Sequence, residues 1–402
     1  MTGAAGSPLI PGNRPQVLAL AGLLLVATVV LSVIGFLHPG SPPDHSILAY
    51  SLLHGRLDVP TSLYDNVPYR GLVYLPFGPL PAALMIPAVF ALGPLVPDIL
   101  LGLILAVCTL PGLNALWKEL GWSDSRERLW LTVLVTGGTV WLSALVVNSS
   151  YFVNHLLVFA VLLWALVLAL RRRAPTAVGL LVGLATLTRS SSVLALIPLA
   201  AVFMVRVEGR RDRLIALSML IVGCVPGILL TGVYNAARFG SPLESGYALQ
   251  QLAYPPLAAA RAVGLFSPAH LPKNLYYLLI AGPLPLGGVG EGVLRFPWVV
   301  PSTWGMGVLW VSPWILAGMC TSRRLGLVLA LGGLFMLIPD LFYYGVGWKQ
   351  FGYRYALDAL PFFAAWAALG LRKPRAARWV PLLAVYGVAV NIAGAAWLLQ
   401  QT

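Results

Sequence analysis

A carboxylate in a polar loop can accept the proton of an attacking hydroxyl group, and Asp44 is the strongest candidate for such chemistry in this sequence. It lies in the segment 38–79, the first long polar interruption of a chain that is otherwise mostly apolar. This segment holds Asp44, Asp58 and Asp65, three of the 13 acidic residues of the protein. Asp44 follows two prolines and precedes an expected short helix over 45–54, so its alternative role is that of an N-cap. The two roles are compatible, because a cap bond would hold the carboxylate in place.

Arg189 is a candidate ligand for a phosphate group. It interrupts the apolar sequence GLATLTRSSSVLALIP, between two short apolar stretches. The planar fork of donors on a guanidinium suits phosphate recognition. The alternatives are an arginine whose stem lies along apolar surface while its head reaches water, and an arginine that pairs with a buried acid.

The segment 347–355 places two further cations, Lys349 and Arg354, among four aromatic residues. It lies at an expected outer membrane boundary, where positive charge is disfavoured. We therefore expect an anionic group, such as a lipid phosphate, to meet these cations. One alternative is an aromatic belt with interfacial cations. The other is an ion pair between Arg354 and Asp358, which stand at i,i+4 spacing.

The other polar residues give weaker signals. A turn-rich segment, 235–247, holds residues that could contact a substrate or simply order the loop. The weaker candidates for substrate contacts are Arg70, Arg238, Glu244, Tyr247 and Tyr353. The histidines and the three cysteines are scattered, without the spacing of metal ligands. The sequence therefore predicts no metal and no other cofactor.

The elements that carry these residues are expected to be membrane helices. Of the 402 residues, 59% are hydrophobic and 10% are charged, with a mean hydropathy of +0.84, whereas globular chains have about 25% charged residues. The net charge of +13 does not indicate a nucleic-acid partner, because most Lys and Arg stand in short clusters between apolar runs. The first run, 16–37, is too long for a signal-peptide core and predicts a retained span.

Apolar runs predict an all-α polytopic membrane protein with about 11 transmembrane helices, in a single integral-membrane domain over residues 1–402. The expected spans are 16–37, 98–117, 129–147, 152–170, 176–188, 191–205, 214–236, 304–321, 325–345, 355–371 and 379–398. Two shorter runs broken by proline, 80–93 and 274–287, are expected at the outer surface.

The distribution of Lys and Arg predicts the orientation of this arrangement. With the N-terminus in the cytoplasm, 17 of the 26 Lys and Arg lie on the cytoplasmic side, as the positive-inside rule requires. The outer side then receives two large loops, 38–97, with juxtamembrane helices, and 237–303. The residues singled out above consequently lie at or near the outer face of the membrane.

Six stretches, in order along nearly the whole chain, carry a family resemblance. They are PPDHSILAYSLLHGRLDV, YLPFGPLPAALMIPAVFALG, GLLVGLATLTRSSSVLALIPLA, YNAARFGSPLESGY, WGMGVLWVSPWILAG and FGYRYALDALPF. Together they resemble the GT-C superfamily of integral-membrane glycosyltransferases, particularly the polyprenyl-phosphate-sugar-dependent, protein-mannosyltransferase/ArnT-like enzymes. The resemblance implies an inverting transferase of the cell membrane that moves a sugar, such as mannose or arabinose, to an acceptor glycan, lipid or protein on the outer face.

The resemblance also implies roles for particular residues. Asp44 matches the outer-loop acid that acts on the acceptor, and Arg189, Lys349 and Arg354 match basic positions that hold the donor phosphate. Two other classes remain open. One is a transporter or flippase for a lipid or phosphate headgroup. The other is a catalytically silent partner of another transferase, because His45 stands where many relatives have a second acid.

Overall fold

The structure, a computed structural model, describes residues 9–60, 66–252, 254–286 and 298–401, so Asp65 and parts of both large predicted loops lie outside the described residues. The described chain is mostly helical. Within it, six helices are long and apolar enough to cross a membrane, and the protein is a multi-pass membrane protein. These helices are α1 (Arg14–Leu37), α4 (Ile99–Glu119), α7 (Ser150–Leu170), α10 (Arg210–Phe239), α14 (Arg324–Phe342) and α17 (Val380–Leu399).

Shorter helices and strands connect and flank these six. The α-helices are α2 (Asp44–Leu53), α3 (Leu80–Leu92), α5 (Ser125–Thr136), α6 (Trp141–Val146), α8 (Pro175–Thr186), α9 (Leu196–Arg206), α11 (Pro255–Ala262), α12 (Leu271–Leu279), α13 (Val308–Val311), α15 (Ala356–Gly370) and α16 (Pro374–Ala377). The 3₁₀ helices are η1 (Ser190–Ala195), η2 (Pro268–His270) and η3 (Pro313–Cys320). Three strand pairs are short: β1 (Val67–Tyr69) with β2 (Leu72–Tyr74) and β3 (Leu284–Pro285) with β4 (Val299–Val300), both antiparallel, and β5 (Trp304–Met306) with β6 (Gln350–Gly352), parallel.

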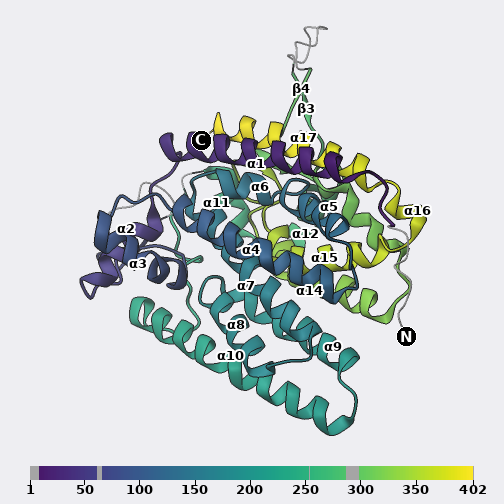
Figure 1. Cartoon of the computed structure of the whole chain (residues 1–402). Helices are drawn as coiled ribbons and strands as arrows, with labels where there is room; N and C mark the ends of the chain where they lie inside the picture. Colours follow the sequence, from purple (N-terminus) through teal and green to yellow (C-terminus); the bar gives the residue numbers. More distant parts are fainter. Residues whose placement is uncertain (1–8, 61–65, 253, 287–297, 402) are drawn as a thin grey trace.

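The helix α7 lies at the centre of the bundle. Most of its side chains are buried, and it packs against α4, α8, α9 and α15. α1 and α17 lie side by side along one edge, and α10 lies along the opposite edge (Figure 1). Only 22% of the apolar window of α1 and 28% of that of α10 is buried. Both helices therefore present apolar outer faces, as lipid-exposed helices do.

Glycines bring α8 and α10 into backbone contact. Gly179 and Gly183 on α8 lie against α10, and Gly223 and Gly227 on α10 lie against α8. Each pair has the four-residue spacing that lets membrane helices approach closely. A Cβ atom on Gly179 would lie 2.0 Å from the carbonyl oxygen of Leu220, so no side chain fits there. This contact fixes the end of α8, which Arg189 follows, against α10.

Asp98 holds the start of α2 against α4 and α7. Its carboxylate accepts the backbone N–H of His45 at 3.1 Å and the hydroxyl of Ser150 at 2.6 Å. A backbone amide at the N-terminus of α2 is thus capped from another part of the chain. The expectation that Asp44 is the N-cap is wrong, because the helix begins at Asp44 itself and Pro43 occupies the N-cap position.

The expected span over 304–321 is not a single α-helix. It contains β5, the short helix α13 and the 3₁₀ helix η3. β5 pairs with β6, and Gly307 lies so close to α12 that a Cβ atom would stand 2.3 Å from the carbonyl carbon of Leu279. Apolar composition alone does not distinguish such an interrupted segment from a continuous helix.

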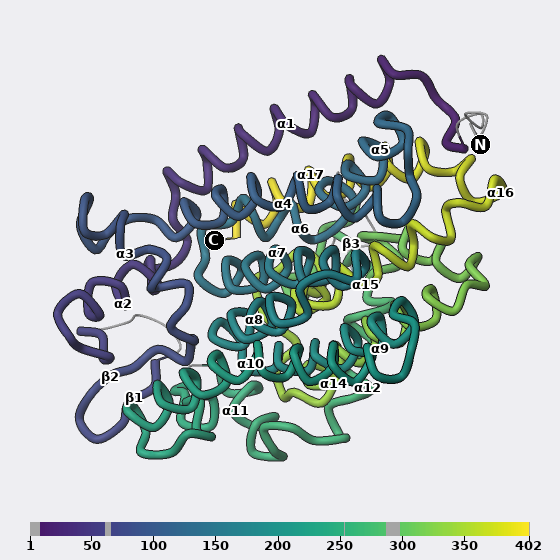
Figure 2. Tube along the Cα trace, turned by 60° about the horizontal axis from the view of Figure 1, so that its bottom comes forward, coloured from purple at the N-terminus to yellow at the C-terminus, as the bar shows by residue number. Residues whose placement is uncertain are grey.

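The two short apolar runs that were expected at the outer surface form short helices and, in the second run, a strand. The run 80–93 forms α3, which packs against α2, and the run 274–287 contains most of α12 and the start of the β3–β4 pair. α2 and α3 gather at one end of the long helices, whereas α9 and α16 lie at the other end (Figures 1 and 2).

We expect Gly179→Ala to destabilise the protein by about 1–3 kcal/mol, because a Cβ atom at this position overpacks a contact with rigid backbone. Thermal or denaturant unfolding in lipid nanodiscs measures the effect. Gly22→Ala on α1 is the matched control, since nothing lies within 4 Å of its added methyl group. An equal loss in both variants would show that the α8–α10 contact is not the cause.

Candidate functional site

A cavity of about 1290 Å³ lies among the ends of several helices. Its walls come from the start of α7, the end of α8, the last turns of α10, the end of α14 and the loops that follow α10 and α14. The segment before α2 closes another part of the wall. Elements far apart in the sequence therefore meet around one space.

The lining of this cavity is positively charged and aromatic. Among its described residues are four cations, Arg189, Arg238, Lys349 and Arg354, and a single carboxylate, that of Asp340. Seven tyrosines also line it: Tyr151, Tyr234, Tyr247, Tyr254, Tyr343, Tyr344 and Tyr355. Such a lining, with several cations that converge on a largely apolar space, suits an anionic ligand with an apolar part.

Arg189 stands at the centre of a buried polar network. Its Nη2 lies 3.1 Å from Oδ1 of Asp340, and its Nε lies 2.8 Å from Oδ2 of Asp358. Its Nη1 lies 3.4 Å from Nε2 of His155, whose Nδ1 lies 2.8 Å from Oδ1 of Asp358. Because Nε2 faces a guanidinium that can only donate, the ring carries its proton on Nδ1 and donates it to Asp358. The network joins α7, α14 and α15 to the segment between α8 and η1.

This network decides between the alternative roles that the sequence left open for Arg189 and for Arg354. Arg189 pairs with buried acids, so that alternative is confirmed. The predicted ion pair between Arg354 and Asp358 is wrong, because Arg354 precedes the first turn of α15 and Asp358 is held by Arg189 and His155. The predicted role of Arg189 as a phosphate ligand stays a prediction.

Arg354 and Arg238 carry buried guanidinium groups that form no salt bridge with a described carboxylate. Nη1 of Arg354 donates to the carbonyl of Trp348 at 3.0 Å, and its buried Nε makes no hydrogen bond with a described residue. Arg238 donates to the carbonyl of Leu75 at 2.6 Å and to Oδ1 of Asn235 at 3.0 Å, and its Nε is likewise unpaired within the described chain. Buried charges are costly unless an anion or strong hydrogen bonds compensate them, so both groups are suited to bind an anion.

Tyr247 supplies a neutral hydrogen-bond donor near these arginines. Desolvation raises the pKa of Tyr247 to about 12, although the charges of Arg189 and Arg354 oppose the shift. The phenol therefore keeps its proton at neutral pH. Arg238 is also within electrostatic range of this phenol, so the hydroxyl lies in the field of three guanidinium groups.

The structure brings five of the predicted site residues together in the cavity wall: Arg189, Arg238, Tyr247, Lys349 and Arg354.

Four predicted site residues do not line the cavity. Asp44 is buried at the start of α2, and Arg70 is exposed in the turn between β1 and β2. Glu244 accepts a backbone N–H within its own loop at 2.6 Å. Tyr353 is buried and donates to the backbone carbonyl of Asp340 at 3.3 Å. The roles of these four residues in catalysis or binding stay predictions.

The segment 347–355 is folded into the protein. Phe351, Tyr353 and Tyr355 are 1%, 2% and 7% exposed, because β6 pairs with β5 and draws the segment inward. The alternative of an exposed aromatic belt is therefore wrong for these residues. Lys349 adopts a backbone φ of +47°, which residues other than glycine rarely adopt, and it lines the cavity.

Sequence reasoning did not select Asp340 or His155 as functional residues. Both stand in long apolar runs, GLFMLIPDLF and SYFVNHLLVFAVLL. A polar group in such a run is costly and is usually functional. A search of every long apolar run for polar residues would therefore have found both Asp340 and His155.

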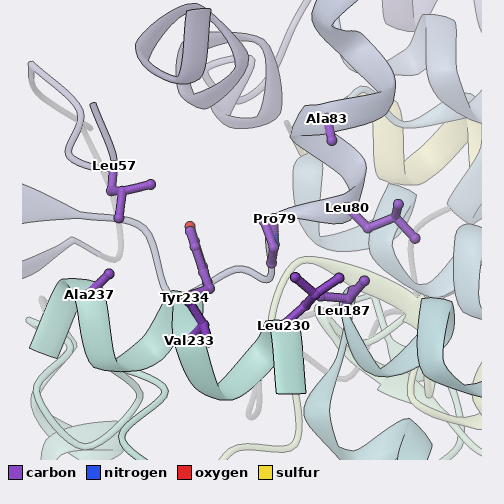
Figure 3. A pocket seen from close by; sticks show the side chains of 9 residues that line it. All are labelled: Leu57, Pro79, Leu80, Ala83, Leu187, Leu230, Val233, Tyr234 and Ala237. Atoms are coloured by element: carbon purple, nitrogen blue, oxygen red, sulfur yellow. The ribbon is translucent and has the colours of Figure 1, made fainter. Parts of the chain in front are cut away.

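A second, apolar cavity of about 340 Å³ adjoins the first (Figure 3). Its lining residues are Leu57, Pro79, Leu80, Ala83, Leu187, Leu230, Val233, Tyr234 and Ala237. Val233 and Tyr234 line both spaces. On α10, Leu229 and Val233 are 62% and 65% exposed and also line the large cavity. The charged cavity therefore borders the lipid-facing surface of the bundle.

Comparisons with known proteins found distant similarities to solved structures. No family model and no curated protein matches the chain. ArnT from Cupriavidus metallidurans bound to undecaprenyl phosphate is similar, with 15% identity, a TM-score of 0.48 and coverage of 90% of this chain and 61% of that chain. The oligosaccharyltransferase AglB from Archaeoglobus fulgidus, in complex with an inhibitory peptide and a dolichol-phosphate, has 13% identity, a TM-score of 0.44 and coverage of 94% and 55%. The chain thus spans less than two thirds of either protein, and values this low establish neither family nor function.

We expect Arg189→Met to destabilise the protein by about 3–5 kcal/mol, because two buried carboxylates would lose their shared cation. Unfolding in nanodiscs or mixed micelles measures the loss. The double variant Arg189→Met/Asp358→Asn should recover part of it, because one of the two buried charges is then removed.

Arg210→Met, at the exposed start of α10, is the control and should change stability by no more than about 0.5 kcal/mol. A similarly small effect of Arg189→Met would contradict a structural role for the network.

Proposed function

We propose that this protein is a GT-C-type glycosyltransferase that moves a sugar from a polyprenyl-phosphate donor to an acceptor at the large cavity. One observation carries the proposal: buried guanidinium groups that form no salt bridge with a described carboxylate line a cavity that borders lipid-facing surface. A lipid phosphate combines the two properties that this space suits, an anionic head and an apolar chain. The sequence resemblance to GT-C transferases supports the same class.

In the proposed membrane arrangement the chain crosses eleven times, and the cavity faces the extracytoplasmic side of the cell membrane. The ends of α8, α10 and α14 and the start of α7 meet at the cavity. The clusters at 118–128, 171–173, 206–213, 323–324 and 372–378 lie at or beyond the opposite ends of these and neighbouring helices. This separation fits the positive-inside rule, with those clusters in the cytoplasm.

The donor phosphate lies against Arg354, Arg238 and Lys349 in this proposal. Their charges are available because no described carboxylate forms a salt bridge with them. Arg189, already paired with two acids, contributes one further N–H at most. The polyprenyl chain of the bound donor extends from the phosphate along the apolar cavity of Figure 3 and over the exposed face of α10.

The proposed reaction is a single displacement at the anomeric carbon. The acceptor oxygen forms a bond to this carbon as the bond to the phosphate oxygen breaks, so the configuration inverts. The acceptor hydroxyl gives its proton to a carboxylate, and the polyprenyl phosphate leaves with the electron pair. Cations at the phosphate stabilise its growing charge. The sequence resemblance assigns the base to Asp44, and mannose and arabinose are the sugars that it suggests.

The function is tested with purified protein in lipid nanodiscs. Radiolabelled polyprenyl-phosphate mannose and arabinose are supplied with a crude membrane extract as the acceptor source. Transfer of label by the wild type supports the proposal. Donor binding without transfer would instead favour a carrier of lipid phosphates or a silent partner, and absence of donor binding would exclude the proposed function.

We expect Arg354→Gln and Arg238→Gln each to weaken donor binding about 10- to 100-fold, because each loses charge-assisted hydrogen bonds worth about 1.5–3 kcal/mol. Binding of the polyprenyl phosphate without its sugar should fall equally, since the contact is to the phosphate. Arg210→Gln is the control on the same helix as Arg238. Unchanged donor affinity in both cavity variants would show that the phosphate does not bind at Arg354 and Arg238.

Tyr247→Phe should weaken donor binding about 3- to 10-fold, because one neutral hydrogen bond is worth about 0.5–1.5 kcal/mol. Since the pKa of Tyr247 is about 12, the phenol stays protonated and donates throughout the range from pH 6 to 10. The ratio of wild-type to variant affinity should therefore be constant over this range. A ratio that collapses near pH 10 would show that the phenol ionises at its ordinary pKa.

A further inference from the structure

We propose that Asp340 is the general base that accepts the proton of the acceptor hydroxyl. This inference rests on the proposed function and adds the residue that activates the acceptor. It departs from the assignment to Asp44, which came from the resemblance of the first outer loop.

The position of Asp340 is the first argument. Asp340 is the only acidic residue among the described residues that line the large cavity. Asp340 stands two residues before the end of α14, directly after Pro339. Its backbone carbonyl is held by the hydroxyl of Tyr353. The group is thus fixed in the wall that also carries the phosphate-binding cations.

The charge balance of the network is the second argument. One guanidinium, that of Arg189, is shared by two carboxylates, and His155 donates to Asp358 as a neutral ring. These residues together carry one excess negative charge. Both oxygens of Asp358 are engaged, one by His155 and one by Arg189, whereas Asp340 receives Arg189 through Oδ1 alone. Asp340 therefore keeps an oxygen, Oδ2, that this network does not engage and that can take a proton.

The placement of Asp44 is the third argument. Asp44 is buried in the first turn of α2, and the cavity wall contains the preceding Gly40 and Ser41 but not Asp44 itself. Asp340 is equally buried, 5% exposed against 7% for Asp44, but it lines the cavity, so an acceptor there would meet Asp340. Asp44 lies outside this wall, in a turn that Asp98 anchors through the backbone N–H groups of His45 and Ser46.

In the resulting step the acceptor O–H bond breaks and its proton passes to the carboxylate of Asp340. The oxygen attacks the anomeric carbon, and the bond from that carbon to the phosphate oxygen breaks. Polyprenyl phosphate is the leaving group and takes the electron pair of the broken bond, and Arg354 and Arg238 stabilise its charge. The hydrogen bond from Arg189 to Oδ1 holds the carboxylate of Asp340 in place for this step.

The test compares Asp340→Asn and Asp44→Asn with wild type in the transfer assay, and donor binding is measured on the same samples. We expect Asp340→Asn to lower the transfer rate at saturating donor by at least 100-fold, as general-base assistance is worth about 10²–10⁴. Its donor affinity should stay within about threefold of wild type. Asp212→Asn, an exposed acid at the far end of α10, is the matched control and should transfer normally.

A folding defect is separated from a catalytic one by Asp340→Glu, which keeps the charge and the ion pair but displaces the carboxylate. It should bind donor normally and transfer at least 10-fold more slowly than wild type. Wild-type transfer by either Asp340 variant would overturn the inference, and so would a loss confined to Asp44→Asn. These outcomes differ from failure of the proposed function, in which the wild type itself neither binds nor consumes the donor.

Discussion

The shared guanidinium of Arg189 is the interaction on which the cavity depends. Between membrane helices no hydrophobic force drives association, because lipid is as apolar as the side chains that pack. Polar contacts therefore have a large part in fixing which helix faces which. Through three nitrogen atoms, Arg189 connects helices that contribute His155, Asp340 and Asp358. The close contact between the glycines of α8 and α10 then places α10, which carries Arg238, beside this network.

The cations of the cavity wall differ in their partners. Arg189 is paired with two carboxylates, those of Asp340 and Asp358. The guanidinium groups of Arg238 and Arg354 instead face aromatic rings and carbonyl groups, and no described carboxylate forms a salt bridge with them. In the proposed reaction the donor brings an anionic phosphate and the acceptor brings a neutral hydroxyl group. The wall thus offers cations to the donor and a carboxylate to the acceptor.

The sequence was sufficient for the helical membrane fold and for part of the site. Long apolar runs predict α7 and α10 correctly, because length and composition determine whether a helix can span a bilayer. Arg189 and Arg354 stand out because charge is rare in or beside such runs, and both line the cavity. The partners of Arg189 could not be read in the same way, since Asp340 is 151 residues away in the chain. Likewise, 304–321 is apolar enough for a span, but its pairing with β6 depends on a distant strand.

The pairing of α1 with α17 has a consequence for how the protein is made. These two helices pack together, yet residues 38–379 lie between them in the chain. During synthesis α1 is made before α17. Until α17 is inserted, the face of α1 that will contact α17 must meet lipid or the insertion machinery. This part of the bundle therefore closes only when α17 has been inserted, after the helices between residues 38 and 379.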